Sequence, residues 1–235
     1  MSGQGPVAVV TAAGQGIGAG CARALSAAGY RMVLQSASGG AVALAEELGG
    51  AGTTGSITSP EDLQTLVALA MERFGRIDAV VNNAGHVPRG DLLSLTDADW
   101  LAGMEMLLLP VIRMARLVTP IMIGQGGGAI VNISTFGAVE PAAGYPISSV
   151  VRSGLGAFTK LYADRYASAG IRMNAVLPGM VENHPIDPAT LAAIPRGTPI
   201  RVVEVAETVR FLLSPEASGL TGQQIRVDAG TGRSF

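Results

Sequence analysis

An apolar run that leads directly into closely spaced glycines constrains this chain more than any other feature. Val7–Val10 are all apolar, Thr11 follows, and glycines occupy positions 14, 16 and 18. Residues 19–28 then carry apolar side chains at spacings typical of an amphipathic helix. A buried strand, a glycine turn and a helix N-terminus together favour a phosphate anion, because unpaired N–H groups and the helix dipole face it. Taken alone, the turn could equally be a tight strand-to-helix connection without a ligand. In its context we predict a dinucleotide-binding site.

Composition limits the class of protein. The chain has 235 residues, 48% of them hydrophobic and 14% charged, with a formal net charge of −2. This length fits one domain with a full-sized core. The charge argues against a nucleic-acid surface and against a polybasic membrane patch. We therefore expect neither a nucleic acid nor a membrane as a partner.

The sequence also argues against a membrane-spanning or secreted protein. The most apolar helical stretch, residues 104–123, is interrupted by Glu105, Pro110, Arg113 and Arg116, so we expect no membrane span. Residues 1–6 lack the basic and apolar regions of a signal peptide. Cys21 is the only cysteine, which fits a reducing cytoplasm. No spacing typical of paired metal ligands is present, so we expect no metal site.

Strand and helix patterns alternate along the chain, with no repeat and no linker. The patterns predict strands over residues 7–10, 31–35, 51–58, 77–82, 129–134, 171–177 and 224–227. They predict helices over 19–28, 39–48, 60–74, 96–123, 145–167 and 204–213, with Pro110 kinking or dividing the fourth. This order predicts an α/β fold, a doubly wound parallel sheet (Rossmann fold) that forms a single domain over residues 1–235. Residues 182–201, rich in proline, are expected to form a short substrate lid.

Five motifs give the chain a family resemblance over essentially its whole length. They are TAAGQGIG at 11–18, NNAG at 82–85, Tyr145 at the head of a long helix, LPG at 177–179 and LTGQQIRVDAG at 220–230. In this order they resemble the short-chain dehydrogenases/reductases. The resemblance implies an NAD(P)-dependent oxidoreductase, a small-molecule substrate and a homo-oligomer, a tetramer or a dimer.

The resemblance also implies which residues bind the cofactor. They are Thr11, Ala12, Gly14, Gln15, Gly16, Ile17, Gly18, Ser36, Ser56, Asn83, Ala84, Gly85, Pro178, Gly179 and Val181. Ala12 replaces the first glycine of the family motif, a mild change if its φ is negative. Ser56 stands where relatives carry an aspartate that contacts adenine. For Asn82 we favour a hydrogen bond that stabilises the sheet over contact with the ligand.

The preference between the two dinucleotides depends on the end of the second strand. An acid there favours NAD, and an arginine nearby favours NADP. Residues 35–38 include neither, and Gln15 is neutral. Without an acid there is no repulsion of a 2′-phosphate, so we predict a slight preference for NADP(H) over NAD(H).

The catalytic set of the family, Asn-Ser-Tyr-Lys, is only partly present. Tyr145 is intact, and its implied role is proton donor or acceptor. The serine position falls on Thr135, with Ser134 as the alternative. Leu107 stands at the Asn position and Ser149 at the Lys position.

Arg152 is the candidate to replace the missing lysine, because positions 145, 149 and 152 share one helix face. An anchor at a subunit interface is the commoner role on this helix and the favoured interpretation. Lys160 is too distant, since fifteen helical residues place it about 22 Å along the axis. For His86 and His184 an ordinary surface role is favoured over catalysis.

Two functions follow. The first is reduction of a small carbonyl or imine compound, with Tyr145 as the proton donor, since a phenol without a neighbouring cation keeps its proton near neutrality. The second is a catalytically weak or inactive dinucleotide-binding protein with a regulatory or structural role. The intact glycine turn and Tyr145 favour the first, and the replaced Asn and Lys favour the second.

Overall fold

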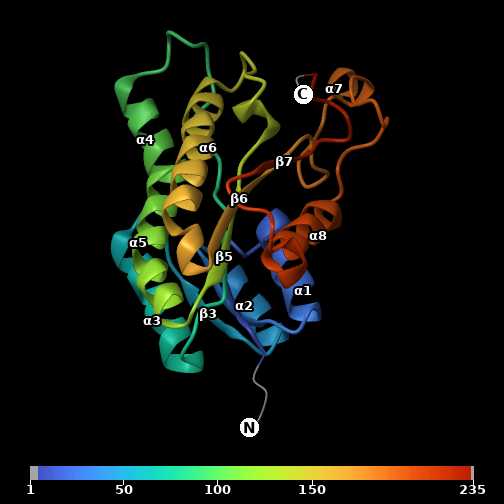
Figure 1. The fold of residues 1–235 in the computed structure, drawn as a ribbon. Coiled ribbons are helices and arrows are strands. Elements are labelled where there is room, and N and C mark those ends of the chain that lie inside the picture. Colours follow the sequence, from blue (N-terminus) through green and yellow to red (C-terminus); the bar gives the residue numbers. More distant parts are fainter. Residues whose placement is uncertain (1–4, 234–235) are drawn as a thin grey trace.

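Seven parallel strands form one sheet in the order β3-β2-β1-β4-β5-β6-β7 (Figure 1). The computed structural model describes residues 5–233, so residues 1–4 and 234–235 of the predicted domain lie outside the described residues. The strands are β1 (Val7–Val10), β2 (Arg31–Ser36), β3 (Ala51–Thr54), β4 (Ala79–Asn82), β5 (Gly128–Ile133), β6 (Ile171–Pro178) and β7 (Gln224–Val227). From β1 the sheet extends through β2 and β3 on one side and through β4 to β7 on the other. This arrangement confirms the predicted doubly wound Rossmann fold.

Helices cover both faces of the sheet. They are α1 (Gly16–Ala27), α2 (Gly40–Glu47), α3 (Pro60–Phe74), α4 (Asp97–Leu107), α5 (Leu109–Gly124), α6 (Pro146–Tyr166), α7 (Pro188–Ala192) and α8 (Val202–Leu213), with 3-10 turns η1 (Phe136–Ala138), η2 (Ala167–Ala169) and η3 (Pro215–Ala217). One face packs against α1, α2 and α8, and the other against α3, α5 and α6. Figure 1 shows these two layers on opposite sides of the sheet.

Alternate residues of the central strands supply the two cores. Ala8 and Val10 of β1 belong to the core under α1 and α8, whereas Val7 and Val9 belong to the core under α3 and α5. All four side chains are fully buried. The continuous apolar run seen in the sequence is therefore explained by burial on both faces of a parallel sheet.

Local chemistry fixes several helix starts. Ser59 Oγ accepts a hydrogen bond from Asp62 N at 3.1 Å, and Pro60 occupies the first helical position of α3. The predicted bounds of α3 are confirmed. Thr96 and Asp99 form a reciprocal capping box at the start of α4.

The helical stretch predicted over residues 96–123 is divided next to Pro110, as the sequence predicts. The joint is Leu108, and α5 resumes at Leu109 with Pro110 in its first turn. By length and composition alone, residues 97–124 could cross a membrane, but 44% of their most apolar window is buried inside the protein. In this fold α5 packs on the sheet, which accounts for that apolar character.

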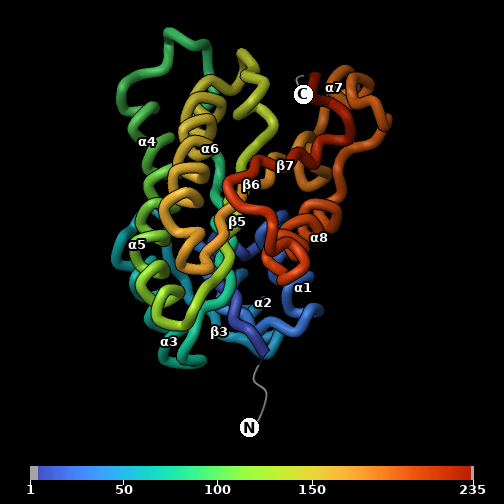
Figure 2. The backbone as a smooth tube through the Cα atoms, in the orientation of Figure 1, coloured from blue at the N-terminus to red at the C-terminus, as the bar shows by residue number. Residues whose placement is uncertain are grey.

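Other boundaries differ from the sequence prediction. The first helix begins at Gly16 rather than at residue 19, because the glycine turn itself forms its first turn. The third strand ends at Thr54, since Ser56 N turns away to donate to the Asp62 carboxylate at 2.7 Å. The carboxyl ends of all strands meet at one edge of the sheet. The last described residues also lie at this carboxyl edge, beside α7 (Figure 2).

Candidate active site

A cleft of about 420 Å³ opens at the carboxyl edge of the sheet, where the strand order reverses. All five predicted catalytic residues line it: Ser134, Thr135, Tyr145, Ser149 and Arg152. Of the predicted cofactor residues, Ala12, Gln15, Gly16, Ile17, Asn83, Ala84, Gly85, Pro178, Gly179 and Val181 line it too. Ligands of open α/β sheets bind at such a crevice.

The glycine turn presents unpaired backbone donors at the cleft. The first hydrogen bond of α1 runs from Ala19 N to Gln15 O, so the N–H groups of residues 16–18 have no helical acceptor. No side chain caps this helix, and its first turn holds no acid. Gly16 has a φ of +55°, and a Cβ at Gly18 would lie 2.4 Å from Ala12 O. These residues therefore fit the pyrophosphate of a dinucleotide.

Ala12 departs from the sequence expectation. Its φ is +47°, in the left-handed region, where the family motif places a glycine. The substitution would have been mild at a negative φ, but here it strains the backbone. That expectation is corrected.

The turn is fastened to the loop after β4. Thr11 Oγ1 donates to Asn83 O at 2.8 Å and accepts from Asn83 N at 2.9 Å. Asn83 Nδ2 donates to Ala12 O at 3.1 Å. Thr11 is buried and does not line the cleft, so its observed role is to hold the turn in place.

Four further predicted cofactor residues lie away from the cleft lining: Gly14, Gly18, Ser36 and Ser56. The Ser36 hydroxyl donates to Ser38 O at 2.5 Å, accepts from Ala41 N and packs against Gly14. The Ser56 hydroxyl pairs with Thr58 at 2.8 Å. Both hydroxyls are thus engaged within their own loops.

Asn82 bonds across the sheet. Its Nδ2 donates to Asn132 Oδ1 at 2.9 Å, and Asn132 Nδ2 donates to Thr159 Oγ1 at 3.0 Å. Asn82 and Asn132 are register partners on β4 and β5. The sheet-stabilising interpretation of Asn82 is confirmed.

Tyr145 occupies the N-cap of α6, as predicted, and its side chain is 39% exposed. Its backbone is anchored, because Tyr145 N donates to Ala142 O at 2.9 Å. The hydroxyl makes no hydrogen bond to the residues that the structure describes. It is free to donate its proton to a ligand in the cleft.

Two hydroxyl residues that follow β5, Ser134 and Thr135, line the same cleft as Tyr145. Thr135 Oγ1 caps η1 by accepting from Gly137 N at a long 3.4 Å. Ser134 Oγ is buried without a hydrogen-bond partner within residues 5–233. Either can orient a carbonyl oxygen, so both alternatives remain.

The positions of the missing family residues are filled by neutral side chains. Ser149 is buried, and its Oγ accepts only a 3.5 Å bond from Ala142 N. Leu107 is buried and lines the cleft. Lys160 pairs with Asp164 on the surface, away from the cleft, so its exclusion is confirmed.

Arg152 points into the cleft. Its Nη1 donates to Ile133 O, and its Nε is buried without a partner in the described part of the chain. Burial lowers the pKa of the Arg152 guanidinium to about 10, so it stays cationic at neutral pH. The favoured interface role does not explain a guanidinium that faces inward.

Three cleft residues gain importance from the structure. The guanidinium carbon of Arg89 lies 4.6 Å from the centre of the Tyr145 ring. The rings of His86 and His184 meet edge to face, with centres 4.8 Å apart. Burial, then the nearby His184, Arg89 and Arg152, lowers the pKa of His86. The sequence could not indicate Arg89, because its loop carries no periodic pattern.

The segment predicted to be a lid contributes residues 183–186 to the lining of the cleft. Its ends pair as a bridge between Val181 and Ile200, and its middle forms α7. Asn183 lies against Gly16, where a Cβ would be 2.8 Å from Asn183 Nδ2. Among residues 5–233 no group of three or more His, Cys, Asp or Glu side chains is placed to hold a metal ion.

Comparisons with known proteins assign the chain to a family. A family model described as enoyl-(acyl carrier protein) reductase matches residues 11–232. The chain belongs to the short-chain dehydrogenase/reductase family of oxidoreductases.

Among curated relatives, 3-oxoacyl-[acyl-carrier-protein] reductase FabG of Vibrio cholerae is 32% identical over 240 residues, covering 98% of each chain. The 3-oxoacyl-[acyl-carrier-protein] reductase of Synechocystis is 34% identical over 237 residues, covering 95% of this chain and 96% of the relative. Oxidoreductase UcpA of Salmonella typhimurium is 33% identical over 248 residues, covering 97% of this chain and 94% of the relative.

Proposed function

We propose that this protein is an NAD(P)(H)-dependent reductase of a small carbonyl or imine compound, with Tyr145 as the proton donor. The observation that carries the proposal is the Tyr145 hydroxyl. It belongs to a residue that lines the cleft together with Ser134 and Thr135, and it makes no hydrogen bond within residues 5–233. The unpaired N–H groups of residues 16–18 fit the cofactor's pyrophosphate.

The cofactor, Tyr145 and one of the two hydroxyls at positions 134 and 135 each supply one part of the proposed reaction. The reduced nicotinamide, when bound, supplies the hydride to the carbonyl carbon. Tyr145 gives its proton to the carbonyl oxygen, which Thr135 or Ser134 orients, and the product is an alcohol. The partly exposed phenol then regains a proton from solvent.

Arg152 is proposed as the cation of the site. A buried positive charge without a carboxylate partner stabilises the negative charge left on the phenol after proton transfer. Arg152→Ala should lower the rate of reduction without changing the oligomeric state, measured by steady-state kinetics and light scattering. Dissociation of the oligomer would instead restore the interface interpretation.

Two experiments test the proposal. Fluorescence titration with NADPH and NADH measures cofactor binding, for which we propose a slight preference for NADPH. A panel of ketones, aldehydes, imines and 3-oxoacyl thioesters, the last suggested by the relatives' names, measures turnover. Tyr145→Phe should lower kcat by about 10²- to 10⁴-fold and leave cofactor affinity unchanged.

The second candidate is a dinucleotide-binding protein without catalysis, with a regulatory or structural role. The neutral Leu107 and Ser149 at two catalytic positions favour it. Cofactor binding with no turnover that depends on Tyr145 would support this candidate. Oxidation of alcohols well below pH 7 would contradict the proposed reductive direction. We also propose a cytoplasmic location, since the only cysteine is free and buried.

A further inference from the structure

The cleft is positively charged and holds no counter-charge. No Asp or Glu stands among the described residues that line it, while Arg89 and Arg152 both do. Neither arginine takes part in a salt bridge of residues 5–233, although the basic side chains at eight other positions do. In a protein with a formal net charge of −2, the cleft thus holds two arginines whose charge no acidic residue of its lining offsets.

Arg89 is placed to meet a substrate rather than a protein group. It follows β4 on an exposed loop and stacks on Tyr145, with 4.6 Å between its guanidinium carbon and the ring centre. Stacking fixes the guanidinium plane but leaves its edge, with five N–H donors, free for a planar anion. A carbonyl that reaches the Tyr145 hydroxyl is then only a few bonds from that edge.

His86 adds a neutral donor beside this charge. The pKa of His86 is lowered by burial and then by His184, Arg89 and Arg152, so the ring is uncharged at neutral pH. A neutral imidazole offers one N–H to an acceptor. His86 also contacts His184 at the start of the lid, which places both rings at the substrate end of the cleft.

We propose that the substrate is a short oxo acid, whose carboxylate binds the guanidinium of Arg89 while its carbonyl meets Tyr145. This inference rests on the proposed reductase function. The cleft of about 420 Å³ must also hold the nicotinamide end of the cofactor, which leaves space for a short chain. A carboxylate matches the planar, two-pronged geometry of a guanidinium.

The test compares acids with their neutral esters. Pyruvate, acetoacetate and levulinate place the carbonyl at increasing distance from the carboxylate, and each has a methyl ester. With NADPH the wild-type protein should prefer at least one acid over its ester by about 10- to 100-fold in kcat/KM. Arg89→Gln should abolish that preference, because the acid loses its partner and the ester loses none.

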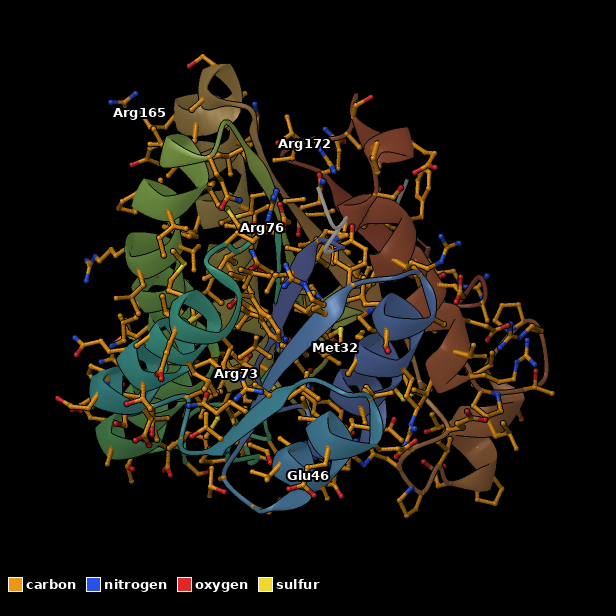
Figure 3. The ribbon with its side chains drawn as sticks, turned by 90° about the horizontal axis from the view of Figure 1, so that it is seen from below. Met32, Glu46, Arg73, Arg76, Arg165 and Arg172 are labelled. Atoms are coloured by element: carbon orange, nitrogen blue, oxygen red, sulfur yellow. The ribbon has the colours of Figure 1, made fainter. Side chains whose placement is uncertain are left out.

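A matched control removes the same charge elsewhere. Arg73 lies in the last turn of α3, near the sheet edge opposite the cleft, and is seen from below in Figure 3. Arg73→Gln should keep the preference for the acid. If Arg89→Gln lowers the turnover of acid and ester by the same factor, Arg89 acts only through Tyr145. This result overturns the oxo-acid proposal and leaves the proposed reductase function standing.

Binding measurements distinguish failure of the oxo-acid proposal from failure of the proposed reductase function. Acids and esters are titrated into the protein–NADPH complex, followed by nicotinamide fluorescence. Binding of acids alone, lost in Arg89→Gln, supports the carboxylate site even if no compound turns over and the reductase function fails. Equal binding of acid and ester, or binding of neither, overturns it.

Discussion

At the scale of single residues, the glycine turn contains a strained alanine. Ala12 has a φ of +47°, and its carbonyl oxygen lies where a Cβ at Gly18 would approach to 2.4 Å. A left-handed backbone costs a non-glycine residue about 1–2 kcal/mol. The strain is held by the hydrogen bond from Asn83 Nδ2 to Ala12 O. It lies at the predicted cofactor loop, as backbone strain at functional sites often does.

Replacing Ala12 by glycine should therefore stabilise the protein. The strain energy that is relieved exceeds the free-energy cost of the extra conformational entropy that glycine gives the unfolded chain. We therefore expect the free energy of unfolding to rise by about 1 kcal/mol. Urea denaturation followed by circular dichroism measures it. Ala13→Gly is the matched control, since Ala13 is fully buried without positive φ and should lose stability. An unchanged or lower stability of Ala12→Gly would contradict the strain.

Cys21 gives a pH-dependent prediction. Complete burial on α1 raises the pKa of its thiol from 9.0 to about 12. The unfolded chain therefore loses this proton first as pH rises, and stability falls between pH 9 and pH 12 but not below. Denaturant midpoints across this range should fall more steeply in the wild type than in Cys21→Ala. The native thiol should also resist iodoacetamide at pH 8, and rapid labelling would show that Cys21 is accessible.

At the scale of elements, α4 and α6 approach closely enough to require a glycine. A Cβ at Gly103 would lie 2.1 Å from Ile147 Cγ2, and Ile147 is fully buried. This crossing holds the first turn of α6, and therefore the residue that caps it, Tyr145. The glycine thus links helix packing to the position of the proposed proton donor.

Gly103→Ala should destabilise the protein by about 1–3 kcal/mol, although alanine is the better helix former. Ile147→Ala alone should cost about 2–5 kcal/mol by leaving a cavity. The double variant should cost less than the sum of the two, because the new methyl group fills part of that cavity. Additive losses in urea unfolding would show that the two positions do not share one contact.

Elements with local signals were predictable from the sequence, and those set by packing were not. Ser59 and Pro60 fixed the start of α3 through cap chemistry, and Tyr145 at the head of α6 followed from the proline after it. The start of α1 was misplaced because glycines disfavour helices in general, yet here they form the first turn. Arg89 and the inward direction of Arg152 depend on loops and on the Ile133 carbonyl, which only the folded chain brings together.

At the scale of the whole molecule, one layer of helices leaves apolar side chains exposed. Leu101 and Met104 of α4 are 63% and 40% exposed, and Val150 and Leu161 of α6 are 57% and 69% exposed. α4 and α6 lie side by side on the same face of the sheet (Figures 1 and 2). Large apolar side chains exposed on one face are typical of a subunit interface. We expect the predicted homo-oligomer to form through this face.

A charge placed on the face should separate the subunits. Leu161 lies eleven residues after Val150, three helical turns along one side of α6, whereas Tyr145 and Arg152 face the cleft. Leu161→Glu should therefore give monomers in light scattering, because a buried carboxylate without a partner is costly. Leu93→Glu makes the same change at a residue that is 90% exposed outside the helices, and it should leave the oligomer intact. A monomeric wild-type protein would contradict this face as an interface. Monomers of Leu161→Glu that keep their cofactor affinity would show that each subunit builds its own cleft, as the inward direction of Arg152 requires.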